Sequence, residues 1–255
     1  MKKLKILKLG GSVITKKSGY KEPNIENIEA LAKMLAGVWK RGIKIIVVHG
    51  AGSFGHGPVM VYGIEKGIKT EKDRVGYSYT HSSCAYLSSL VVDALIKYGV
   101  PSISIPPAVI IKQKNGRIKS FNKKIVYEYL KAGFLPVLYG DMVLDEKLGG
   151  SVCSGDKIVA ELGKDAEIIV LGTNVDGVLA DGKVVEKITR KNFEKVSKHL
   201  GGAGTTDVTG GMRGKILEIM KARRPAYVVN ALHPNRIEAL LLGKKKPVCT
   251  EISGK

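Results

Sequence analysis

Three glycine-rich segments of this chain each carry a basic side chain or a histidine. They are Lys8-Leu9-Gly10-Gly11-Ser12, the segment His49 to Gly57, and Thr209-Gly210-Gly211-Met212-Arg213-Gly214-Lys215. Backbone N–H groups in glycine-rich turns and at helix N-termini bind phosphate oxygens. Lysine ammonium groups stabilise the negative charge of a phosphoryl group in transfer. The three segments together therefore predict a phosphoryl-transfer site, although no Walker A sequence occurs.

The second segment is the most specific of the three. It has four glycines within residues 50–57, directly after an apolar run, so the backbone can approach a ligand closely. His56 lies near its end, where it can donate a hydrogen bond or a positive charge to a phosphate. His81, His199 and His233 have no comparable surroundings, and we interpret them as ordinary surface or packing residues.

The charge of the chain favours acidic ligands. Lys and Arg number 42 against 23 Asp and Glu, which gives a net charge of +19. The basic residues are spread along the chain and aromatic residues are only 6%, so no basic segment is interleaved with rings that could stack on bases. We expect a field that attracts small phosphorylated substrates, and no nucleic-acid partner.

Cysteine usage and hydropathy bear on the compartment. Cys84, Cys153 and Cys249 are far apart and lack metal-ligand spacing, as expected for thiols in a reducing compartment. No apolar run approaches the roughly 20 residues of a membrane span, and the first nine residues fit a strand better than a signal peptide. We expect a soluble cytoplasmic protein without a membrane partner.

Strand-like and helix-like segments alternate, which predicts a mainly parallel sheet covered on both faces. Predicted strands span 5–9, 43–48, 101–105, 136–139, 167–171, 227–229 and 248–252, and predicted helices span 24–41, 74–98, 123–131 and 235–242. Further helices follow Asp156, as an N-cap, and the loop 201–211; hairpins are predicted at 115–116, before Ser154 and at 181–182. The glycines at 10–11, 50–57, 140 and 172 follow strands, so they should gather along one edge of the sheet.

The order of these motifs resembles the amino acid kinase family over nearly the whole chain. To the three segments above it adds Gly-Asp at 140–141 and Thr-Asn-Val-Asp-Gly at 173–177. The resemblance implies an α/β fold, a three-layer αβα sandwich with an open, mainly parallel central sheet. It implies a single domain over 1–255, in which about 1–165 binds the phosphate acceptor and about 166–255 binds ATP.

Within that family, Gly-Ser-Phe-Gly-His with the histidine at position 56 is similar to the isopentenyl phosphate kinases. This implies ATP-dependent phosphorylation of isopentenyl phosphate to isopentenyl diphosphate, in an archaeal-type mevalonate route of isoprenoid synthesis, with dimethylallyl phosphate as a further substrate. ATP and Mg²⁺ are the implied cofactors, and a homodimer is the implied assembly. We find no dedicated carboxylate cage, so ATP phosphates and water are expected to hold the metal.

The resemblance also assigns roles to residues by position. It places Lys8 and Lys17 at the transferring phosphoryl group and His56 at the phosphate of the acceptor. Asp141 is expected to orient lysines. The other acceptor-site residues are Ala51, Gly52, Gly155 and Asp156. The implied ATP-binding residues are Lys8, Gly10, Gly11, Ser12, Gly52, Asp176, Gly211 and Lys215.

Two alternatives remain open from the sequence. One is a kinase for another small phosphate or phosphonate, since the fosfomycin-resistance kinases share the histidine. The other is a non-catalytic regulator that binds nucleotide or nucleic acid. Retention of both Lys8 and Lys17 argues against the regulator.

Overall fold

The computed structural model describes residues 3–16, 19–200 and 211–253. Its strands are β1 (Lys5–Leu9), β2 (Ile45–His49), β3 (Ser102–Ser104), β4 (Ile111–Lys114), β5 (Arg117–Phe121), β6 (Leu135–Tyr139), β7 (Asp141–Asp145), β8 (Gly149–Cys153), β9 (Ile168–Thr173), β10 (Leu179–Ala180), β11 (Lys183–Val184), β12 (Lys187–Ile188), β13 (Ala226–Asn230) and β14 (Thr250–Ile252). Its helices are α1 (Gly11–Ile14), α2 (Ile25–Lys40), α3 (Ser53–Tyr62), α4 (Glu71–Lys97), α5 (Pro107–Ile110), α6 (Lys123–Lys131), α7 (Gly155–Gly163), α8 (Phe193–Lys198), α9 (Gly211–Met220) and α10 (Pro234–Leu242).

The central sheet has the order β12-β14-β13-β9-β1-β2-β6-β3. From β13 through β3 every neighbouring pair is parallel, whereas β14 is antiparallel to β13 and β12 is parallel to β14. The prediction of a mainly parallel sheet is therefore confirmed. Since β9, β1, β2 and β6 are adjacent and parallel, their carboxyl ends meet along one edge.

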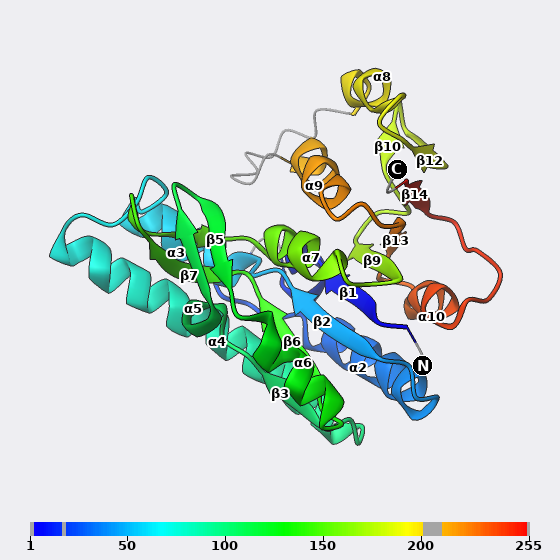
Figure 1. Ribbon diagram of the computed structural model, residues 1–255, viewed down its shortest axis with the longest axis horizontal. Helices are drawn as coiled ribbons and strands as arrows, with labels where there is room; N and C mark the ends of the chain where they lie inside the picture. The colour runs from blue at the N-terminus through cyan, green and yellow to red at the C-terminus, as the bar shows by residue number, and fades with distance from the viewer. Residues whose placement is uncertain (1–2, 17–18, 201–210, 254–255) are drawn as a thin grey trace.

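Helices cover both faces of this sheet, which makes three layers (Figure 1). Successive side chains of a strand point to opposite faces. Accordingly Leu7 of β1 packs in a core with α2, α4 and α10, whereas Ile6 packs in a second core with α6, α7 and α9. Both faces of β1 are buried, and the burial includes Lys8 as well as the apolar residues of the strand.

A smaller sheet, β5-β4-β7-β8, stands beside the end of β6 and packs near α4 (Figure 1). Its β4–β5 hairpin turns at Asn115 and Gly116, both with positive φ of 50° and 72°, as the Asn-Gly pair predicts. The hairpin expected before Ser154 is formed by β7 and β8. The predicted hairpin at 181–182 is formed by β10 and β11.

One carboxylate, that of Asp145 at the end of β7, ties the two hairpins of this smaller sheet together. It is buried and accepts hydrogen bonds from the backbone N–H groups of Asn115, Gly116, Lys147 and Leu148 and from the hydroxyl of Ser151. Burial alone would raise the pKa of Asp145, but these donors hold it well below its usual range.

The substitution Asp145→Asn should lower the free energy of unfolding by about 2 kcal/mol, because an amide group cannot accept from all five donors. The stabilisation by wild-type Asp145 should be complete above about pH 4 and lost as the pH falls below that value, since the pKa of the folded state is the lower one. Urea unfolding at pH 7 and pH 3 measures both effects. Glu146→Gln, which removes a surface pair with Lys119, is the control and should change little. Equal losses in the two variants would refute this role of Asp145.

Among the residues that the structure describes, none of the helices combines the length and apolar character needed to cross a bilayer.

Candidate active site

The glycine turns that follow four neighbouring strands are hydrogen-bonded to one another across the sheet edge. The N–H of Gly10 donates to the carbonyl of Gly172 at 2.8 Å, and that of Gly50 donates to Leu9 at 2.8 Å. The N–H of Gly140 donates to the carbonyl of His49 at 2.9 Å. The expectation that these glycines gather along one edge is confirmed.

The turns after β1 and β2 interlock so closely that side chains cannot fit between them. A Cβ on Gly11 would lie 2.4 Å from the backbone nitrogen of Gly52, and one on Gly50 would lie 2.6 Å from that of Gly11. Gly52 has φ +52° and begins α3 as its N-cap. The hydroxyl of Thr15 donates to the carbonyl of Gly11 and accepts from the N–H of Ser53, which fixes the two turns together.

Gly50→Ala should therefore push the two turns apart and cost about 2 kcal/mol of stability together with most of the activity. Thermal unfolding and ATP turnover measure these effects. Gly37→Ala in α2 is the matched control, because a Cβ there meets nothing within 4 Å and alanine favours a helix. An active Gly50→Ala enzyme with an unchanged melting temperature would contradict the close contact.

Lys8 extends from β1 into this edge and is 6% exposed. Its Nζ lies 3.2 Å from Oδ1 of Asp156, and its Cε lies next to Gly155 at the start of α7. Asp156 was predicted to be the helix N-cap, but this is wrong. Ser154 is the N-cap, because its hydroxyl accepts from the N–H of Lys157. Asp156, in the first turn, is free to pair with Lys8.

Asp141 was expected to orient lysines, but the structure gives it a different partner. Its buried carboxylate lies 3.0 and 3.1 Å from Nδ1 of His81 in α4 and accepts from the N–H of Met142. Burial raises the pKa of Asp141, whereas the hydrogen bond that the His81 ring makes to this carboxylate raises the pKa of His81. The carboxylate that orients Lys8 is Asp156.

His81 is thus a residue of this edge that we had interpreted as ordinary. It is about a third exposed and belongs to a helix 60 residues before its partner. Gly140, which precedes Asp141, lies against the backbone nitrogens of Ala51 and Gly155. Gly-Asp directly after a strand was the only sequence signal for this pair, and it did not indicate which side chain would meet the aspartate.

His56 lies on α3 and not in a loop, because the helix begins at Ser53. The predicted glycine-rich loop to residue 57 is therefore three residues long, from 50 to 52. The side chain of His56 is exposed one turn from the N-terminus of α3. Gly55 of the same turn packs against Ala51, whose Cβ lies 2.5 Å from the position a Cβ on Gly55 would take. No side chain larger than hydrogen fits at position 55.

His49 at the end of β2 is fully buried and stacks on Tyr139, with ring centroids 5.5 Å apart. Burial and the neighbouring charge of Lys8 lower its pKa to about 4, against the hydrogen bond with the carbonyl of Gly50, which acts to raise it. Its ring is therefore neutral at pH 7 and adds no charge beneath the turns.

The residues expected to bind ATP follow β1 and β9 and begin α9. The Ser12 hydroxyl donates to Asn174 at 3.3 Å, which links the turn after β1 to the segment after β9. Asp176 accepts from Asn230 at 3.0 Å and pairs with Arg236 of α10, and these hydrogen bonds lower its pKa. Gly211 begins α9, and Lys215 lies one turn further on, half-buried.

Part of the expected site lies outside the described residues. Lys17 does, and so does most of the loop before α9, residues 201–210. Lys16 is described, and its ammonium group pairs with Glu22 at 2.6 Å on the surface. The rival candidate to Lys17 therefore has a surface partner.

Carboxylates that could hold a metal by themselves are not gathered here. In the described ranges, no three residues among His, Cys, Asp and Glu form a possible metal site. The glycine turns suit phosphates through their backbone N–H groups, which are the donors that phosphate oxygens require. Residues Gly10 to Ser12 and the start of α9 would hold the ATP phosphates. Phosphates and water would supply the ligands of Mg²⁺.

The comparisons with known proteins agree with this geometry. The amino acid kinase family matches residues 3–230, so the chain belongs to that family. It is 36% identical to isopentenyl phosphate kinase of Methanocaldococcus jannaschii, over 94% of this chain and 96% of that protein. It is 38% identical to isopentenyl phosphate kinase of Methanothermobacter thermautotrophicus, over 98% of this chain and 99% of that protein.

Comparison with solved structures also gives a similarity to isopentenyl phosphate kinase. An X-ray structure of isopentenyl phosphate kinase superposes with a TM-score of 0.83 at 33% identity, covering 98% of this chain and all of that one. The prediction of the family and of its three-layer fold is confirmed.

Proposed function

We propose that this chain transfers the γ-phosphoryl group of ATP to isopentenyl phosphate and so forms isopentenyl diphosphate. The observation that carries the proposal is the buried Lys8–Asp156 pair, which stands at the edge where the glycine turns meet. The similarity to isopentenyl phosphate kinases over nearly the full length of both chains supports this acceptor.

The residues would act by position and charge. Lys8 is held by Asp156 in a buried position, so its ammonium group is preorganised for the charge that develops on the transferring group. Lys17 and Lys215 supply further positive charge at the γ-phosphate and the ATP phosphates. The N–H groups of Ala51 and Gly52 lie at the junction of donor and acceptor, and His56 binds the acceptor phosphate.

No base is needed to activate the acceptor. A phosphate monoester has a second pKa near 6, so it is largely dianionic at neutral pH. Its oxygen can attack directly, and cations that hold it in line with ATP are sufficient. ATP supplies the phosphoryl group, and Mg²⁺ neutralises charge on its phosphates.

Residues 1–165 would bind the acceptor and residues 166–255 the nucleotide. Asp176 and Gly211 belong to the nucleotide side of this division, and Gly155 to the acceptor side. The family resemblance supports a homodimer, which sedimentation would test. Buried, unpaired thiols at Cys84, Cys153 and Cys249 support a cytoplasmic location.

ATP consumption should be measured with isopentenyl phosphate, dimethylallyl phosphate, fosfomycin and acetylglutamate as acceptors. We expect turnover with the two isoprenoid phosphates at a kcat/KM at least about 100-fold above the others, because a site whose polar groups are placed for one acceptor rejects another that leaves them unpaired. Turnover of fosfomycin alone would replace the proposal with the phosphonate kinase. ATP binding without transfer to any acceptor would favour a regulator.

A further inference from the structure

A basic cavity lies at the edge of the central sheet opposite the glycine turns. Its volume is about 550 Å³, and its lining is Lys164, Lys221, Ala222, Arg223 and Arg224. Helices α7 and α9 end here: a Cβ on Gly163 would lie 3.1 Å from that of Ala222. The N–H of Ile169, the second residue of β9, donates to Pro225, so the cavity faces the amino end of this strand.

This cavity is distant from the proposed site of phosphoryl transfer. Helix α9 begins at Gly211, whereas the cavity lies at Lys221, which follows the end of the helix ten residues after Gly211 and six after Lys215. At a rise of about 1.5 Å per residue, roughly 15 Å of helix separates Gly211 from Lys221. The glycine turns lie at the other end of the strands, so a ligand here would not occupy the acceptor site.

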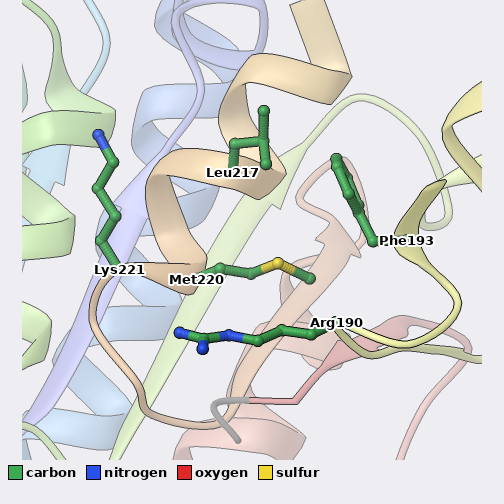
Figure 2. A pocket seen from close by; sticks show the side chains of 5 residues that line it. All are labelled: Arg190, Phe193, Leu217, Met220 and Lys221. Atoms are coloured by element: carbon green, nitrogen blue, oxygen red, sulfur yellow. The ribbon is translucent and has the colours of Figure 1, made fainter.

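An apolar pocket adjoins the basic cavity around the last turn of α9. It has a volume of about 260 Å³, and its lining is Arg190, Phe193, Leu217, Met220 and Lys221. In Figure 2, Phe193 lies across from Leu217, and Met220 and Arg190 lie alongside each other below them. Lys221 lines both cavities. Leu217 is 39% exposed, which leaves an apolar side chain at the surface.

Helix capping accounts for some of these basic side chains, but not for all of them. The guanidinium of Arg224 donates to the carbonyl of Lys164, which satisfies the end of α7. Lys164 pairs with Glu161, and Lys221 pairs with Glu218.

Two guanidinium groups remain. Within the described part of the chain, those of Arg190 and Arg223 make no hydrogen bond or ion pair with protein groups. Glu161 and Glu218 pair with two of the five basic side chains, and the charge of Arg224 also acts on Asp165. The basic side chains still outnumber these three carboxylates, and two of them, Arg190 and Lys221, line the apolar pocket.

We propose that the two cavities form a second ligand site, which binds a free organic diphosphate with a hydrocarbon tail of the prenyl type. The diphosphate head lies among Arg190, Lys221 and Arg223, and the tail lies on Phe193, Leu217 and Met220. A nucleotide fits less well, because its base would bury hydrogen-bonding groups against apolar side chains. The inference concerns binding only, so it stands or falls apart from the acceptor of the phosphoryl transfer.

Calorimetric titration of the full chain with geranyl diphosphate tests this site, with AMP-PNP and isopentenyl phosphate present in excess. We expect saturable binding at one site per chain. The double variant Arg190→Gln/Arg223→Asn should weaken it at least tenfold; asparagine suits the positive φ of 55° at position 223. Leu217→Gln should weaken the binding of geranyl diphosphate by a similar factor and leave the affinity for inorganic diphosphate, which binds less tightly, unchanged. Lys245→Gln, at an exposed lysine outside both cavities, is the control.

Each other outcome would overturn the proposal. Equal affinity for inorganic and geranyl diphosphate would show that the hydrocarbon tail does not contribute to binding at this site. Loss of binding in the Lys245 control would indicate attraction by net charge alone. Competition by ADP for this site would reassign it to a nucleotide, and equal binding to phosphatidylglycerol vesicles would reassign it to a membrane surface.

Discussion

Replacing Lys8 by methionine should lower kcat by about 10³-fold. Lys8 is buried and held 3.2 Å from Asp156, so its charge is fixed before the reaction and needs no reorganisation during it. Loss of one such preorganised group costs about 10²–10³ in kcat in other enzymes that stabilise developing negative charge. Steady-state kinetics with ATP and isopentenyl phosphate measure this loss, which should fall on kcat more than on either KM.

Lys5→Met is the matched control for this substitution. Lys5 lies on the same strand, but its ammonium group donates to the carbonyl of Leu241 at 2.8 Å, at the far end of β1. Lys8→Met also leaves Asp156 unpaired in a buried position, which can destabilise the fold. The double variant Lys8→Met/Asp156→Asn removes that charge and should fold like the wild type yet stay inactive. An active double variant would exclude Lys8 from the chemistry.

His56→Ala should lower kcat/KM for the phosphate acceptor by about 10²-fold and leave the KM for ATP unchanged. The side chain is exposed on the first turns of α3, next to the turn that carries Ala51 and Gly52. Its removal should cost a charge-assisted hydrogen bond to the acceptor phosphate without disturbing the core. The test is whether the kinetic parameters change for the acceptor alone, since a purely structural role of His56 would change those for the acceptor and for ATP.

His199→Ala controls for loss of a histidine in general. That ring pairs with Asp181 on the surface, in the half of the chain proposed to bind ATP. The substitution His199→Ala should change the kinetic parameters of neither substrate. A folded His56→Ala enzyme with wild-type kinetics for the acceptor would remove His56 from the site.

The fold was predictable because local patterns and topology agree along the chain. β1 and α6 begin and end at the predicted residues, and α2 begins after its Asn24 cap as expected. Asn115-Gly116 and Asp181-Gly182 mark hairpins because these residues accept the positive φ that such turns require. The line of strand-end glycines follows from parallel topology alone.

The pairing of charged residues was not predictable in the same way. The Lys8–Asp156 and His81–Asp141 pairs join residues far apart in the sequence, and only the packed structure selects between Asp141 and Asp156 as the partner of Lys8. The start of α3 was missed because glycine disfavours helices, whereas the close packing of Gly55 against Ala51 in the preceding turn and Cys84 of α4 favours glycine at this position. Residues 17 and 201–210 lie outside the described residues, so their predicted roles stay predictions.

A crystal structure with isopentenyl phosphate and AMP-PNP would test the central claim most directly. We expect the two molecules to meet end to end over the glycine turns, with the acceptor phosphate beside the ring of His56. The terminal phosphate of the nucleotide should lie within hydrogen-bond distance of the Lys8 ammonium group. An acceptor phosphate bound elsewhere, with Lys8 still paired to Asp156 and contacting neither ligand, would contradict the account.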